Sequence, residues 1–170
     1  SPYGVSKHAV EQYLYSFKEN RGLDYVVLRY PNVYGPRQDP HGEAGVVAIF
    51  SLQLLTGKRP VIFGNGSKTR DYCYVSDIVD ANILALNSPS GAIYNLGRGI
   101  ETTDLEMFQT VQETVGSNVE PLFAEMRPGE VQHIALDASK AEEELGWKWK
   151  VDLIEGISRA VEFYRTVSGE

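Results

Sequence analysis

Short apolar segments alternate with segments of helical periodicity along almost the whole chain, and this alternation constrains the fold most strongly. Apolar, β-branched or aromatic runs predict strands at residues 24–31, 59–64, 71–75, 92–97, 119–124 and 133–137. Apolar residues at helical spacing predict helices at residues 3–21, 45–56, 76–87, 102–116, 138–145 and 153–167. Because strands that alternate with helices are typical of α/β proteins, the sequence predicts an α/β fold.

Three local features refine this prediction. Residues 24–31 are almost continuously apolar, so we expect a strand that is buried on both faces. The polar stretch at residues 32–45 is longer than most loops in compact domains, which indicates either a functional role or disorder. Thr103 and Glu106 have the spacing of a capping box and predict that a helix begins there.

The composition excludes several classes of function. The 170 residues carry a net charge of -7, which disfavours nucleic-acid binding because that function needs a basic face. Cys73 is the only cysteine, so no internal disulfide can form, and the three histidines show no metal-ligand spacing. No apolar run approaches the ~18 residues of a membrane span. We therefore expect a cytoplasmic protein that binds no metal, membrane or nucleic acid.

Tyr3 and Lys7 stand four residues apart in the first predicted helix. Side chains at this spacing leave the same face of a helix about one turn apart. An ammonium beside a phenol favours the phenolate, so the pair can act as a general base toward a hydroxyl group. The same spacing arises by chance in many helices, which leaves a purely structural role open.

Two glycine-containing stretches match phosphate-binding loops only in part. Gly97 and Gly99 follow a predicted strand and precede a predicted helix, but Thr102 stands where a third small residue is needed. The stretch G-N-G-S-K-T-R at residues 64–70 lacks both a third glycine and the lysine–serine pair of a Walker loop. We therefore expect that no dinucleotide phosphate loop lies in this chain.

Four stretches, taken in order, resemble one family. They are S-P-Y-G-V-S-K, L-R-Y-P-N-V-Y-G-P-R, G-N-G-S-K-T-R-D-Y-C-Y-V-S-D, and R-P-G-E followed by D-A-S-K-A. With them the chain resembles the C-terminal half of an extended short-chain dehydrogenase/reductase of the NAD-dependent epimerase/dehydratase family, and it is most similar to UDP-glucose 4-epimerases. The family's glycine-rich N-terminal half has no counterpart, and no methionine starts the chain. We therefore expect a fragment.

The resemblance implies a fold in two parts. One is the C-terminal part of a Rossmann-type parallel sheet, and the other is a smaller α/β substrate-binding lobe. Residues 1–35 and 74–99 would belong to the NAD-binding domain, and residues 36–73 and 100–170 to the lobe for the nucleotide sugar. The resemblance also implies a homodimer through the helix that carries Tyr3.

Individual residues acquire roles from the same resemblance. Tyr3 would be the catalytic acid/base, and Lys7 would promote its ionisation. Contacts to NAD would come from Tyr3, Lys7, Tyr30, Pro31 and Val33. Contacts to a UDP-sugar substrate would come from Asn32, Val46, Val61, Phe63, Arg70, Arg127 and Glu130. Within the second set, the two arginines would clamp the diphosphate and the glutamate would accept hydrogen bonds from the ribose.

The implied activity is the interconversion of UDP-glucose and UDP-galactose, or of a close analogue, by transient oxidation at C4 with bound NAD. We expect the isolated fragment to be inactive. Two alternatives stay open. One is a nucleotide-sugar 4,6-dehydratase or a UDP-uronate decarboxylase or epimerase of the same family. The other is a non-catalytic module that binds sugar nucleotides.

Overall fold

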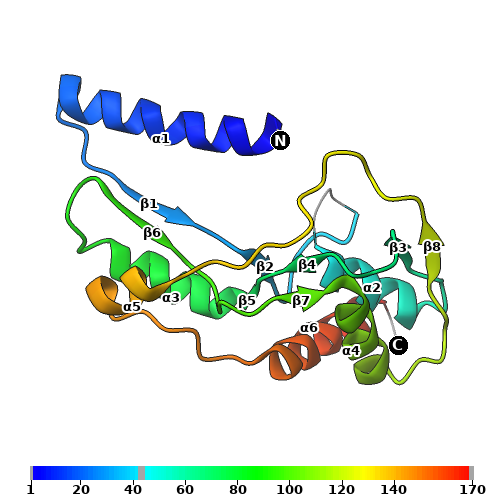
Figure 1. Ribbon diagram of the computed structural model, residues 1–170. Coiled ribbons are helices and arrows are strands. Elements are labelled where there is room, and N and C mark those ends of the chain that lie inside the picture. Colours follow the sequence, from blue (N-terminus) through cyan, green and yellow to red (C-terminus); the bar gives the residue numbers. More distant parts are fainter. Residues whose placement is uncertain (1, 42–44, 169–170) are drawn as a thin grey trace.

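Helices and strands alternate along the chain in the computed structural model, which describes residues 2–41 and 45–168 (Figure 1). The helices are α1 (Pro2–Arg21), α2 (Val46–Leu55), α3 (Val75–Ala85), α4 (Asp104–Val115), α5 (Ser139–Leu145) and α6 (Leu153–Ser168). The strands are β1 (Val26–Arg29), β2 (Asn32–Tyr34), β3 (Val61–Phe63), β4 (Thr69–Arg70), β5 (Tyr72–Tyr74), β6 (Ala92–Asn95), β7 (Thr102–Thr103) and β8 (Leu122–Ala124). The predicted α/β fold is confirmed.

One part of the molecule is built on the parallel pair β1–β6. Val26 lies opposite Ala92 and Arg29 opposite Asn95 in this pair, and α1 and α3 lie on its two sides (Figure 1). Its core consists of Cys73, Ile78, Ala81, Tyr94, Leu96, Ala141 and Trp147. Helix α5 therefore packs with this part, although it is distant from β1 in the sequence.

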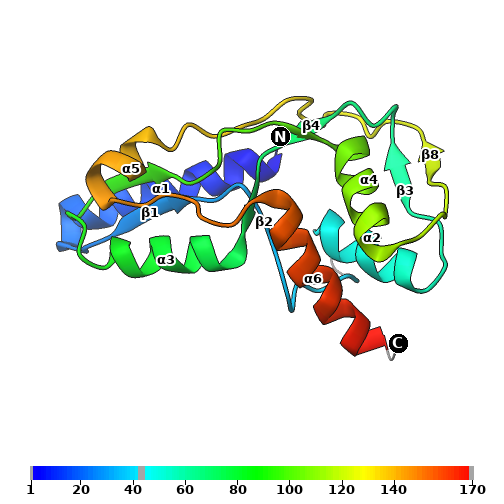
Figure 2. The same ribbon diagram turned by 90° about the horizontal axis from the view of Figure 1, so that it is seen from below.

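The other part contains α2, α4 and α6, which pack against one another (Figure 2). Beside them lie the parallel pair β3–β8 and the antiparallel pair β4–β7. A larger core fills this part and includes Val47, Phe50, Leu54, Ile62, Met107, Phe108, Val111, Ile157, Val161 and Tyr164. This second core supports the walls of the pocket described below.

The parallel pair β2–β5 lies between the two cores. Tyr72 and Tyr74 of β5 belong to the larger core, whereas Cys73 between them belongs to the smaller one. On β2, Tyr34 faces the larger core and Val33 packs against the smaller one. Because successive strand residues point to opposite faces, two short strands can serve both parts at once.

Helix α4 begins as the sequence predicts. The hydroxyl of Thr103 accepts from the backbone N–H of Glu106 at 3.0 Å, and the Glu106 carboxylate accepts from the backbone N–H of Thr103 at 2.7 Å. This capping box satisfies donors that the first turn of a helix leaves unpaired. The predicted capping box is confirmed.

Helix α1 is attached to the rest of the molecule mainly through polar contacts. The Arg29 guanidinium donates to both Glu11 carboxylate oxygens, at 2.8 and 2.7 Å, which lowers the pKa of Glu11. Lys18 Nζ donates to the Ser90 carbonyl at 2.7 Å. No described residue of α1 is buried, and β1 is only partly buried. The prediction that β1 is buried on both faces is therefore wrong, because β1 pairs only with β6 in the described part of the chain.

Asp71 explains why the strand predicted at residues 133–137 does not form. Its buried carboxylate accepts from the backbone N–H groups of Arg98, Gly99 and Leu136 at 3.0–3.1 Å. The Leu136 N–H therefore donates to a side chain, whereas in a β-sheet it would donate to a backbone carbonyl of a neighbouring strand. The prediction of this strand is wrong, although its apolar pattern is real.

Candidate functional site

A pocket of about 420 Å³ lies between β3, β4, the start of α4, and one face of α2. The segment that follows β8 closes its remaining side with Arg127 and Glu130. All the residues for which sequence analysis predicts substrate contacts line this one pocket: Asn32, Val46, Val61, Phe63, Arg70, Arg127 and Glu130. Their roles toward a ligand stay predictions.

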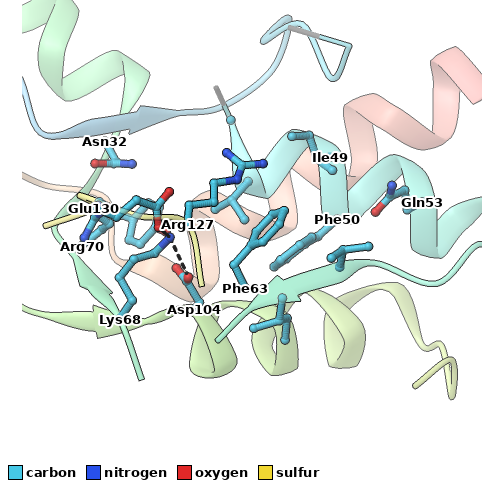
Figure 3. Close-up of a pocket in the computed structure, with 15 residues that line it drawn as sticks. Asn32, Ile49, Phe50, Gln53, Phe63, Lys68, Arg70, Asp104, Arg127 and Glu130 are labelled. Atoms are coloured by element: carbon cyan, nitrogen blue, oxygen red, sulfur yellow. Dashed lines mark hydrogen bonds and ion pairs between the residues drawn. The ribbon is translucent and has the colours of Figure 1, made fainter. Parts of the chain in front are cut away.

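The pocket has one charged end and one apolar end (Figure 3). Asn32, Lys68, Arg70, Asp104 and Glu130 gather at the charged end. Ile49, Phe50 and Phe63 form the apolar end together with Gln53, whose Oε1 is buried and has no hydrogen-bond partner among the described residues. The cavity can therefore accept a ligand that is anionic on one side and flat and apolar on the other.

Arg127 spans the two ends. Its guanidinium carbon lies 4.0 Å from the centre of the Phe63 ring, within the range of a cation–π contact. Arg70 is held from the other side, where its Nη1 donates to the carbonyl oxygens of Thr69 and Val131 at 2.6 and 2.8 Å. Within residues 2–41 and 45–168, neither guanidinium has a carboxylate partner within 4.0 Å. Both therefore have N–H groups left for an anionic ligand.

Lys68 is the third cation of the pocket, and its situation differs. Its Nζ lies 2.9 Å from Glu130 Oε2 and 3.2 Å from Asp104 Oδ2 (Figure 3). Burial raises the pKa of Asp104, and the charge of Lys68 opposes that rise. Sequence analysis assigned no role to Lys68 or Asp104. Lys68 directly precedes β4 and lies two residues before Arg70, so extended backbone at this position could have indicated that both side chains lie on the same side.

Tyr3 and Lys7 lie together on α1, outside the residues that line the pocket. Lys7 Nζ is 5.3 Å from the centre of the Tyr3 ring, so the two side chains leave the same face of the helix. The Tyr3 side chain is open to solvent, with a relative exposure of 71%. The N-terminal end of α1 points toward the part of the molecule that holds the pocket (Figures 1 and 2).

The three residues predicted to line the nicotinamide lie at the end of β1 and in β2. The Tyr30 hydroxyl donates to Asn82 Oδ1 at 2.8 Å and is thereby directed toward α3. Pro31 is partly buried between the strands, and Val33 packs against the smaller core. None of the three lines the pocket. Their contacts to a cofactor stay predictions.

The Gly97–Gly99 turn has a structural explanation. The backbone N–H groups of Arg98 and Gly99 donate to Asp71, so they are not free to hold a phosphate. A Cβ placed on Gly97 would lie 2.5 Å from Asp71 Oδ2, which excludes a larger residue unless the turn shifts. The backbone N–H groups of this turn are therefore not available to a dinucleotide pyrophosphate.

Within residues 2–41 and 45–168, no three His, Cys, Asp or Glu side chains cluster closely enough to hold a metal ion. No helix in those same ranges combines the length and the apolar character needed to cross a bilayer.

Fold and pocket together define an α/β protein with a cleft lined by charged residues at one end and apolar residues at the other, and comparison with known proteins places the chain in a family. The model of the NAD dependent epimerase/dehydratase family matches residues 1–97. The chain belongs to this family. The resemblance stated from the sequence motifs is thereby confirmed.

The chain is similar over nearly its whole length to proteins named UDP-glucose 4-epimerase. One from Mycolicibacterium smegmatis is 47% identical over 170 residues, which cover 99% of this chain and 54% of the relative. A crystal structure of the Thermotoga maritima enzyme with UDP-glucose superposes with a TM-score of 0.95 at 48% identity, over 99% of this chain and 54% of that one. The Thermus thermophilus enzyme in complex with NAD gives 0.92 at 44% identity, over 97% and 54%.

These comparisons also bear on the fold. The chain spans about half the length of the relatives that it matches. It corresponds to the C-terminal part of Rossmann-type epimerase structures, so the predicted fold class is confirmed.

Proposed function

We propose that this chain is the substrate-binding half of a UDP-glucose 4-epimerase and that its pocket holds the UDP moiety. One observation carries the proposal. Seven residues from distant parts of the chain line a single pocket, and two of them are arginines without a carboxylate partner in the described residues. Two guanidinium groups in one cavity, Arg70 at the charged end and Arg127 between the two ends, suit a diphosphate, and the apolar end suits a nucleobase.

The positions of the side chains indicate which part of UDP each of them contacts in this proposal. Arg70 and Arg127 hold the phosphates, Asn32 lies beside them, and Phe63 forms the wall for the base. With the nucleotide held by these contacts, a keto sugar can turn over while the nucleotide stays in place. Residues 1–35 and 74–99 belong, in this proposal, to the NAD-binding domain, and residues 36–73 and 100–170 to the substrate lobe.

Tyr3 and Lys7 perform the proton chemistry in this proposal. NAD, when bound, would supply hydride-transfer chemistry at C4 of the sugar, and Tyr3, Lys7, Tyr30, Pro31 and Val33 would hold it there. The Tyr3 phenolate takes the proton of the sugar 4-hydroxyl and later returns it to the 4-oxygen, so no proton is gained or lost overall. Lys7, on the same helix face, stabilises the phenolate by its charge.

A chimera that joins the N-terminal part of the Thermotoga maritima enzyme to this chain tests the proposal. We expect it to interconvert UDP-glucose and UDP-galactose. Tyr3→Phe should abolish turnover and leave UDP binding within about twofold, and Tyr15→Phe, at an exposed site on the same helix, should leave both unchanged. Full turnover by the Tyr3→Phe chimera would refute the assignment.

The same experiment separates the alternatives. A 4-keto-6-deoxy product would identify a dehydratase, and release of carbon dioxide from a UDP-uronate would identify a decarboxylase. Tight UDP-sugar binding by an inactive chimera would favour a binding module. We further propose that the enzyme is cytoplasmic and dimerises through α1, and that the 170 residues alone are inactive because they hold no dinucleotide phosphate loop.

A further inference from the structure

Lys68 is the only cation in the described lining of the pocket that contacts carboxylates. Its Nζ lies between Glu130 Oε2 and Asp104 Oδ2, at 2.9 and 3.2 Å. All three side chains are mostly shielded from water, with relative exposures of 15% for Lys68, 24% for Glu130 and 11% for Asp104. Two shielded carboxylates largely balance the positive charge of Lys68, so little of its attraction remains for a phosphate.

Glu130, the carboxylate that contacts Lys68 at the shorter distance, belongs to a segment without regular secondary structure. Residues 125–133, which carry both Arg127 and Glu130, form neither helix nor strand. Three successive residues, Lys68 and the two residues of β4, contact this segment. Lys68 Nζ donates to the Glu130 carboxylate. The Thr69 backbone N–H donates to the Gln132 carbonyl, and Arg70 Nη1 donates to the Val131 carbonyl, both at 2.8 Å. Of these contacts, only that of Lys68 reaches a side chain of the segment 125–133 that lines the pocket, because the other two reach backbone carbonyls.

Removal of Lys68 would change the charge balance at this end of the pocket. Asp104 and Glu130 would then both face the space that the ammonium had occupied, and like charges in a shielded site repel one another. Glu130 can relieve the repulsion by turning away, since it lies on the irregular segment, whereas Asp104 is fixed at the start of α4 by the hydrogen bond from its N–H to the Lys68 carbonyl at 2.9 Å. The carboxylate predicted to meet the ribose would be lost.

We propose that Lys68 is a positioning residue that holds the Glu130 carboxylate in its binding orientation, and that it thereby sets the affinity for the nucleoside without touching the phosphates. Only Glu130 Oε2 is engaged by Lys68, which leaves Oε1 to accept from a ligand hydroxyl. The inference rests on the proposed function, because it assumes that the pocket holds UDP.

A double-mutant cycle tests the inference, with the dissociation constant of UDP measured by calorimetry on the 170-residue chain. We expect Lys68→Met to weaken UDP binding about tenfold and Glu130→Gln to weaken it by a similar factor. The dissociation constant of the double variant should be no larger than that of the more strongly affected single variant, because both changes remove the same oriented carboxylate. Lys68→Arg should restore most of the affinity. Lys148→Met, which removes an exposed lysine paired with Glu142, serves as the matched control.

UMP provides a readout that separates action through Glu130 from a direct contact with the second phosphate. If Lys68 acts through Glu130, Lys68→Met should weaken UMP and UDP binding by the same factor. A larger loss for UDP would assign Lys68 to the phosphates and overturn the inference, as would single-variant losses that multiply in the double variant. Glu130→Gln leaves Lys68 paired with Asp104, so it keeps the cycle informative if Lys68→Met lowers the melting temperature.

Different results would overturn the role of Lys68 and the proposed function of the pocket. UDP binding with multiplied losses would overturn only the role of Lys68. Absence of UDP binding by both the unmodified chain and the chimera would overturn the proposed function and this inference with it.

Discussion

The guanidinium of Arg127 lies against the face of the Phe63 ring, with its central carbon 4.0 Å from the ring centre. The two residues come from different segments, one in β3 and one after β8, and these strands pair in parallel with Phe63 opposite Ala124. The ring supports a guanidinium on an irregular segment, while the guanidinium edge stays available for hydrogen bonds. This contact connects the apolar end of the pocket to the charged end.

Replacement of Arg127 should weaken UDP binding strongly. Charge-assisted hydrogen bonds contribute about 1.5–3 kcal/mol, so Arg127→Ala should raise the dissociation constant at least about tenfold. Arg127→Lys should recover only part of the loss, because an ammonium lacks the planar fork. Calorimetric titration with UDP measures both effects, and Arg21→Ala at the exposed end of α1 is the control. Unchanged affinity of Arg127→Ala would contradict the proposed phosphate contact.

Asp71→Asn should destabilise the fold. The buried carboxylate accepts three backbone N–H groups, and an amide in its place directs an NH₂ group toward at least one of these donors. We expect a loss of about 2 kcal/mol in the free energy of unfolding, measured by urea denaturation. Asp80→Asn, which disrupts the exposed pair with Lys150, should change that value by less than about 0.5 kcal/mol. Equal effects of the two substitutions would show that Asp71 does not organise the turn.

The capping box of α4 should make stability depend on pH in the acidic range. Hydrogen bonds from the backbone N–H and the hydroxyl of Thr103 lower the pKa of Glu106 in the folded state. The unfolded state therefore binds more protons, so this contribution is present above the unfolded pKa of about 4.3 and is lost as pH falls through the lower folded value.

The contribution of Glu106 is measured by comparing the free energy of unfolding of the unmodified chain with that of Glu106→Gln at pH 7 and at pH 3. We expect the variant to be less stable at pH 7 by only roughly 0.3–1 kcal/mol, because Glu106 is largely exposed and solvent screens its charge. The difference should shrink at pH 3. Glu113→Gln in the same helix is the control, and a difference that grows on acidification would contradict the assignment.

Helix α1 should promote self-association. Val10, Tyr13 and Phe17 follow helical spacing, and each is more than half exposed. Contiguous exposed apolar surface of this kind marks interaction sites. Tyr13→Glu combined with Phe17→Glu should shift the chain toward monomer in sedimentation velocity, whereas Gln12→Glu on the opposite face should not. A chain that is monomeric at about 100 μM without substitution would contradict the proposed dimer contact.

The local sequence pattern was sufficient to predict several features of this protein. The alternation of strands and helices, the capping box of Thr103 and Glu106, and the Tyr3–Lys7 spacing depend on residues within one or two turns of each other, so the sequence alone determined them. The ordered motifs, taken with the family resemblance, also indicated which residues would line the pocket.

Tertiary structure decided what depends on distant groups. Lys68 and Glu130 are 62 residues apart, and no local period indicates that they meet. The segment at residues 133–137 has a strand-like pattern, yet its Leu136 N–H donates to the Asp71 carboxylate, because that acceptor arrives from a different part of the chain. Side-chain periodicity specifies which face of a helix or strand is apolar. The pairing of charged and polar groups from distant segments is decided only when tertiary packing brings those segments together.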